Sequence, residues 1–150
     1  HQNIRTPRSN TEAYSASYAF REELGLKLLL LVAKSFYSGE EPWNADTLSR
    51  QLEVPVGVAR DLLRQHSQAG FLIAATKDNQ ELFLPARPPE TLGLAQVIEA
   101  MRDYGGDAAK TRPFDGDDAL ARVLEQAAES RRSALAHLTL KDLLTEKKST

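Results

Sequence analysis

Apolar residues recur at helical spacing over residues 20–37, and this run is rich in leucine and free of proline. They spread over more than one face, so we expect a helix that other elements cover on several sides. Such a helix lies at the centre of a core or also supplies a dimer face. Ser38 and Gly39 follow it, and glycine is the usual residue at a left-handed helix stop.

Two shorter helices are predicted next. Asn44 precedes the segment ADTLSRQL and can accept hydrogen bonds from the first free amides of a helix. Pro55 stands near the first turn of a third helix, which Gly70 closes. The apolar residues of the two segments recur at helical spacing and can share one core. Together they predict a helix-turn-helix.

The pattern then changes from helical to extended. Residues 71–73 are apolar, residues 77–80 are typical of a turn, and residues 81–84 form a second extended run, which predicts a β-hairpin. Three helices followed by a two-stranded wing make a winged helix. The expected fold is therefore mainly α with a small β-hairpin, a winged helix-turn-helix plus a C-terminal helix.

The chain divides into four parts on this reading. Thr91 is placed to cap a fourth helix, and glycine and acidic residues follow that helix. We expect a polar arm or linker over 1–18, the winged-helix domain over 19–104, a mobile acidic and glycine-rich loop over 105–118, and a C-terminal helix with a basic tail over 119–150.

Composition narrows the class of protein. The chain has 150 residues, of which 41% are hydrophobic and 27% charged, as expected for one soluble globular domain. It has no cysteine, which excludes thiolate zinc sites, cysteine-ligated iron–sulfur clusters, cysteine nucleophiles and disulfides. The formal net charge is −2, so nucleic acid could be attracted only by a local basic patch.

No residues suggest catalysis or metal binding. The three histidines fall in three separate segments, and His66 is expected to be a partly exposed helix residue rather than a ligand. The acids Asp115, Asp117 and Asp118 lack the glycine, spacing and terminal glutamate of a calcium loop. We therefore expect no catalytic residues, no metal ligands and no cofactor, and hence no enzyme.

The third helix and the wing are the place to look for DNA binding. Arg60, Arg64 and Lys77 are the candidate contacts to nucleic acid. Three acids, Asp61, Asp78 and Glu81, balance them, and the helix begins with Pro55, Val56 and Gly57, which offer no side-chain hydrogen bonds. A neutral face gains little from the release of counterions, so DNA binding is disfavoured but stays open.

Two leucine-bearing helices are candidates for contact with a protein partner or a second copy. Leu26 and Leu30 on the first helix, and Leu120 and Leu124 on the last, are the candidate self-association residues, and a homodimer is one expectation. Trp43 is the sole tryptophan, and we expect it to pack over the end of the first helix.

Long segments of the chain resemble a known family. The run LLLLVAKSFYSGEEPWNADTLSRQLEVPVGVARDLLRQHSQAGFL and the exit LPARPPETLGLAQVIEAM resemble the C-terminal cytoplasmic domain of the YihY/BrkB membrane proteins, which are described as ribonuclease BN-like. The resemblance implies a domain of a bacterial inner-membrane protein, joined to the membrane through a missing upstream region, with 1–18 as its juxtamembrane arm. No residue supports a ribonuclease activity in this chain.

Other segments of the chain resemble a second family. The segments ARPPE and LGLAQVIEAM and the terminal LTLKDLL are similar to the Rrf-type winged-helix transcription regulators, some of which use cysteine-bound iron–sulfur clusters. The chain departs from them in having no cysteine and a longer arm. Our hypothesis is a non-catalytic module of a YihY/BrkB-like protein that acts through protein contact or dimerisation. The alternative is a DNA-binding transcription regulator of the Rrf type.

Overall fold

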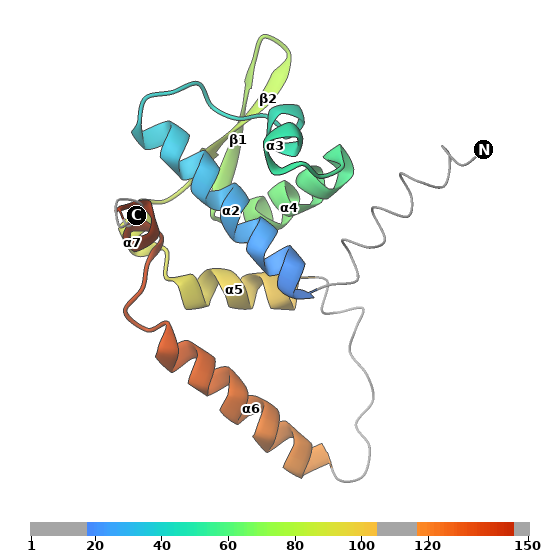
Figure 1. The fold of residues 1–150 in the computed structure, drawn as a ribbon, viewed down its shortest axis with the longest axis vertical. Coiled ribbons are helices and arrows are strands. Elements are labelled where there is room, and N and C mark those ends of the chain that lie inside the picture. The colour runs from blue at the N-terminus through green and yellow to red at the C-terminus, as the bar shows by residue number, and fades with distance from the viewer. Residues whose placement is uncertain (1–17, 105–116, 146–150) are drawn as a thin grey trace, which may run out of the picture.

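The computed structural model describes residues 18–104 and 117–145, and it shows the winged helix-turn-helix that the sequence predicts (Figure 1). Helices precede and follow a two-stranded antiparallel wing. The elements are α2 (Tyr18–Tyr37), α3 (Ala45–Leu52), α4 (Val56–Gln68), β1 (Leu72–Lys77), β2 (Gln80–Pro85), the short 3-10 helix η1 (Pro89–Thr91), α5 (Leu94–Asp103), α6 (Asp117–Ala134) and α7 (Leu140–Thr145).

Helix α2 is the centre of the core. It contacts α3, α4, β2, α5 and α7, which explains why its apolar residues spread over several faces. Leu28, Leu29 and Ala33 have no exposed surface. Phe36, next to the C-terminal residue of α2, is 47% exposed.

The helix-turn-helix is fixed by local hydrogen bonds. The side chain of Asn44 accepts from the backbone N–H of Thr47, and the Thr47 hydroxyl accepts from the N–H of Asn44, so the predicted cap is a full capping box. Glu53 then adopts a left-handed conformation with φ of 59°, which turns the chain toward α4. Pro55 precedes α4 directly.

The wing forms in the predicted place. Lys77 pairs with Gln80, and the two residues between them, Asp78 and Asn79, both have positive φ, as a tight two-residue hairpin turn requires. The backbone N–H of Phe83 donates to the carbonyl of Trp43. The Trp43 indole N–H donates to the carbonyl of Leu31 on α2, so this tryptophan packs where we expect it.

The last helix returns to the core. The N–H of Leu140 donates to the carbonyl of Leu92, and the N–H of Leu94 donates to that of Leu138, so the start of α7 is bonded to the start of α5. Leu140 is fully buried. Thr91 does not cap α5 as expected, since its hydroxyl donates to the carbonyl of Pro88, just before η1, and Gly93 takes the cap position.

Helix α6 lies away from the other helices (Figure 1). Its Arg132 reaches the Glu99 carboxylate on α5 at 2.8 Å and also contacts Glu125 and Glu129 on α6 itself. This contact turns the charged face of α6 toward α5. At 100° per residue, Leu120, Val123, Leu124 and Ala127 fall on the opposite face.

His66 is buried rather than partly exposed, which corrects the sequence expectation. It retains only 1% of its surface because its side of α4 packs against α2. Its Nε2–H donates to the carbonyl of Gly25 at 2.9 Å, and its ring lies against Phe71. Burial lowers the pKa of His66 to about 4, and the hydrogen bond to Gly25 opposes that shift only in part.

The buried histidine makes folding stability depend on pH. Between pH 6.5 and about 4 the unfolded chain binds a proton at His66 and the folded chain does not. The free energy of unfolding therefore falls as the pH is lowered through this window, by about 3 kcal/mol from this residue. Urea unfolding at several pH values should show a shallower slope for His66→Gln than for the parent chain. The same change at exposed His137 should leave the slope unaltered, and equal slopes for the parent and His66→Gln would contradict the account.

Three sequence expectations lie outside the described residues. They are the arm over residues 1–17, most of the acidic loop over 105–116, and the basic tail over 146–150. Among the described helices, none has the length and apolar character needed to cross a membrane.

Candidate nucleic-acid interface

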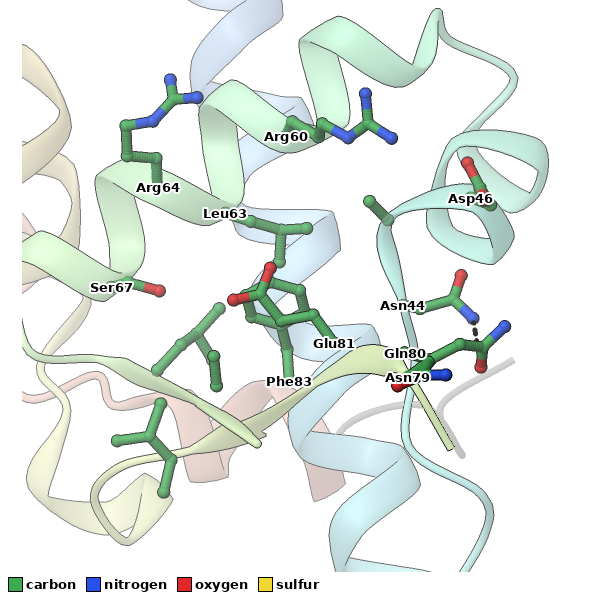
Figure 2. A pocket seen from close by; sticks show the side chains of 14 residues that line it. Asn44, Asp46, Arg60, Leu63, Arg64, Ser67, Asn79, Gln80, Glu81 and Phe83 are labelled. Atoms are coloured by element: carbon green, nitrogen blue, oxygen red, sulfur yellow. Dashed lines mark hydrogen bonds between the residues drawn. The ribbon is translucent and has the colours of Figure 1, made fainter. Parts of the chain in front are cut away.

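A groove of about 790 Å³ separates α4 from the wing. Figure 2 shows Arg60, Leu63, Arg64 and Ser67 reaching it from α4, and Glu81 and Phe83 from β2. Apolar side chains form its floor, and polar and charged groups surround them. In winged helices that bind DNA, the second helix of the helix-turn-helix enters the major groove, and this surface is the corresponding one here.

The two arginines of α4 differ in whether their side chains are paired with an acid. Arg64 Nη1 lies 3.2 Å from a carboxylate oxygen of Asp61, one helical turn earlier. Arg60 has no ion-pair or hydrogen-bond partner within residues 18–104 and 117–145, and it is exposed at the groove. Arg60 is therefore the cation most available to a phosphate or a base edge.

The sequence suggests that Asp61 neutralises one of the arginines of the groove, but the structure pairs Asp61 with a third arginine. Its second carboxylate oxygen lies 2.7 Å from Arg21 on α2, and that oxygen also accepts from the Gln65 amide at 3.2 Å. Arg21 is outside the helix and wing whose charges the sequence tally compared. Because Arg21 offsets Asp61, the charges left at the groove are Arg60 and Arg64 against Asp46 and Glu81.

Lys77 is separate from the two arginines. It ends β1 beside the tip of the wing, and its ammonium group lies 3.5 Å from the Glu41 carboxylate. Lys77 does not line the groove. The structure thus brings Arg60 and Arg64 to one surface and leaves Lys77 at the edge of it.

Several uncharged polar groups at the groove were missed from the sequence. Asn44, Ser67, Asn79 and Gln80 all line it, and the Asn44 amide donates to the Gln80 side chain at 3.4 Å (Figure 2). Asn44 is readable in the sequence only as a helix cap. Nothing in the spacing of residues 44 and 80 indicates that the cap of α3 meets the wing. Amide and hydroxyl groups of this kind can hydrogen-bond to base edges.

The candidate self-association residues lie on two unlike surfaces. Leu26 and Leu30 on α2 are half-buried and packed against the core. Leu120 and Leu124 are 45% and 60% exposed on α6, with Val123 at 59% between them. Only the α6 pair belongs to an apolar stripe that the described part of the chain leaves uncovered.

The described residues hold no group of three or more histidine, aspartate and glutamate side chains that could bind a metal ion. The acids at the groove, Asp46 and Glu81, come from α3 and β2.

Comparison with known proteins identifies the fold by its shape. No family model matches the sequence, and no curated protein matches it either. Among solved structures, IscR of T. potens superposes with a TM-score of 0.64 at 17% identity, over 85% of each chain. CymR, the global cysteine regulator of B. subtilis, superposes with a TM-score of 0.61 at 16% identity, over 84% of this chain and 94% of its own. CymR of Staphylococcus aureus has a TM-score of 0.61 at 15% identity, over 83% and 95%.

These neighbours overturn the first resemblance. They are transcription regulators of the IscR and CymR type, and not the cytoplasmic domain of a YihY/BrkB membrane protein. The ribonuclease BN-like identity, the function as a membrane-protein module and the placement at a bacterial inner membrane are therefore wrong. A membrane partner has no support, and DNA becomes a partner to be considered. The expectation that the chain is not an enzyme agrees with the neighbours, which are regulators.

Proposed function

We propose that this protein is a DNA-binding transcription regulator that reads DNA with α4 and the wing. The observation that carries the proposal is the groove between those two elements, where Arg60 has no side-chain partner among the described residues and Arg64 is held by Asp61. The likeness in fold to IscR and CymR supports it. The second resemblance in the sequence, to Rrf-type regulators, leads to the same function.

The composition of the groove sets the kind of binding we expect. Two arginines against two acids give little long-range attraction, so affinity for arbitrary DNA should be modest. Discrimination would come from hydrogen bonds of the arginines and of neutral groups such as Asn79 and Ser67 to base edges and phosphates. A nearly neutral groove thus favours recognition of a particular sequence over general binding.

We also propose that α6 joins two copies of the chain. Its charged face is turned toward α5 by Arg132, so the stripe of Leu120, Val123 and Leu124 remains to be covered. An apolar stripe along one helix can cover itself in a two-fold dimer, because the same surface serves both partners. A dimer would present two α4 helices to DNA, as the symmetric binding sites of helix-turn-helix proteins require. Leu26 and Leu30 contribute little, being already packed against the core.

Fluorescence anisotropy with a labelled duplex of mixed sequence tests the first part. We expect weak binding at low salt that weakens further as salt is raised, with a slope of about one ion for each arginine that contacts a phosphate. The control is a duplex in which phosphate charges are replaced by neutral methylphosphonates. Absence of any binding at low salt, or binding that is indifferent to salt and to the phosphates, would contradict the proposed interface.

A further inference from the structure

A second groove, with a volume of about 530 Å³, is lined by other residues than the groove between α4 and the wing. It is bounded by α2, by the end of α3 and by α7. Its walls are leucines that are partly buried and pack with their other side against the core, namely Leu30, Leu31, Leu52, Leu143 and Leu144. The volume is in the range of pockets that hold small molecules.

Two lysines of α2 stand at this groove. Lys27 and Lys34 are seven residues apart, two helical turns, and so project from the same face with about 10 Å between them along the axis. Lys27 lies 3.2 Å from Glu23, and both of these side chains are largely exposed. The side chain of Lys34 has no ion-pair or hydrogen-bond partner in the described ranges. Among the described residues that line the groove, the charged ones are these two lysines and one acid, Glu53.

The geometry points to a binding site for a small amphiphilic anion, with an apolar body against the leucines and a carboxylate at Lys34. The leucine walls gain stability from covering their exposed surface. The ammonium group of Lys34 is a point charge that pairs with a carboxylate without demanding a fixed plane, as an arginine would. A purely apolar occupant would leave that pairing unused.

The position of the groove indicates what occupancy would do. Its walls join α3, the first helix of the helix-turn-helix, to α7, which is bonded through Leu92 to the start of α5. A ligand there contacts both parts at once and can alter how they sit together. A change in the affinity for DNA caused by this rearrangement rests on the proposed function, whereas the binding of the ligand itself does not.

The test uses decanoate as the probe, kept below its micelle concentration and followed by isothermal titration calorimetry and by amide chemical shifts. Decanol and decyltrimethylammonium carry the same alkyl chain with a neutral and a positive head. We expect saturable binding of decanoate, about tenfold tighter than decanol, with the cationic analogue weakest, and shifts at α2, α3 and α7. Lys34→Glu should weaken decanoate about tenfold or more. Lys141→Glu, the same reversal at an exposed α7 residue outside the groove, should not.

Equal affinity for the three heads, an unchanged affinity in Lys34→Glu or no saturable binding would overturn the proposal. Shifts at the groove that depend on protein concentration alone would also overturn it, since the occupant would then be a second copy of the chain. None of these outcomes depends on whether the protein binds DNA, so failure here is distinct from failure of the proposed function.

Discussion

Replacing Leu124 by aspartate is expected to convert a dimer of this chain into a monomer. Leu124 is 60% exposed in the single chain and lies at the middle of the apolar stripe of α6. The change removes apolar contact and places a charge in the interface. Both effects occur twice in a two-fold dimer, because each copy contributes the same residue. We expect a loss of roughly 3–6 kcal/mol, which raises the dimer dissociation constant more than a hundredfold. Sedimentation velocity at several concentrations measures it.

A control on the same helix separates the interface from the helix itself. Gln126 is exposed and lies off the stripe, and Gln126→Asp introduces the same side chain. It should leave the dimer intact. Because two α4 helices must reach two half-sites, Leu124→Asp should also weaken DNA binding, and Gln126→Asp should not. A parent chain that is monomeric at all concentrations would show that α6 has another role.

Replacing Arg60 by alanine is the second large change. Arg60 is exposed at the groove and has no partner among the described residues, so its removal costs the fold little. If it contacts a base or phosphate, its loss should cost ~1–3 kcal/mol of binding, roughly 5- to 150-fold in dissociation constant. If Arg60 contacts a phosphate, its removal should also lower the salt dependence of binding by about one ion. If it contacts a base, its removal should relax the sequence preference.

The matched control removes the same charge from another surface. Arg102 on α5 pairs with Glu22 and does not line the groove. Arg102→Ala should leave the affinity for DNA nearly unchanged, apart from a small general effect of net charge. If Arg60→Ala and Arg102→Ala weaken binding equally, the arginine of α4 acts only through total charge and the groove is not the binding surface.

Local signals in the sequence were enough to predict the order of elements. Four features are decided by neighbours a few residues away. They are the Asn44 cap, the break at Pro55, the turn at Asp78 and Asn79, and the change from helical to extended spacing after Gly70. Each of these features can be recognised from a short segment of the sequence. The winged helix followed from them without any distant contact.

Distant contacts explain what the sequence analysis missed. Asp61 meets Arg21, which is forty residues away, and a tally of one helix and one wing could not include it. His66 is buried because its side of α4 faces α2, where its ring bonds to the carbonyl of Gly25, forty-one residues earlier in the chain. Leu140 bonds to Leu92, and no pattern within either segment indicates that pairing.

The mistaken family has a physical explanation too. The residues that carried the resemblance, such as Leu28, Leu48, Leu62 and Phe71, are buried core positions of the winged helix. Any chain with this fold needs apolar residues there, so they identify the fold and not the function. The residues that bear on function lie on the surface, and the sequence placed Arg60 on the third helix without showing that Asp61 is paired with Arg21 and leaves Arg60 unpaired within the described part of the chain.

Selection of binding sites from a library of random-sequence duplexes tests the central claim most directly. The account predicts enrichment of a two-fold symmetric sequence whose half-sites are separated by about one helical turn or a multiple of it. It also predicts that Arg60→Ala weakens or alters this preference and that Leu124→Asp abolishes the paired half-sites. Recovery of the library without enrichment, by a chain that is folded and dimeric, would contradict the claim that α4 and the wing read DNA.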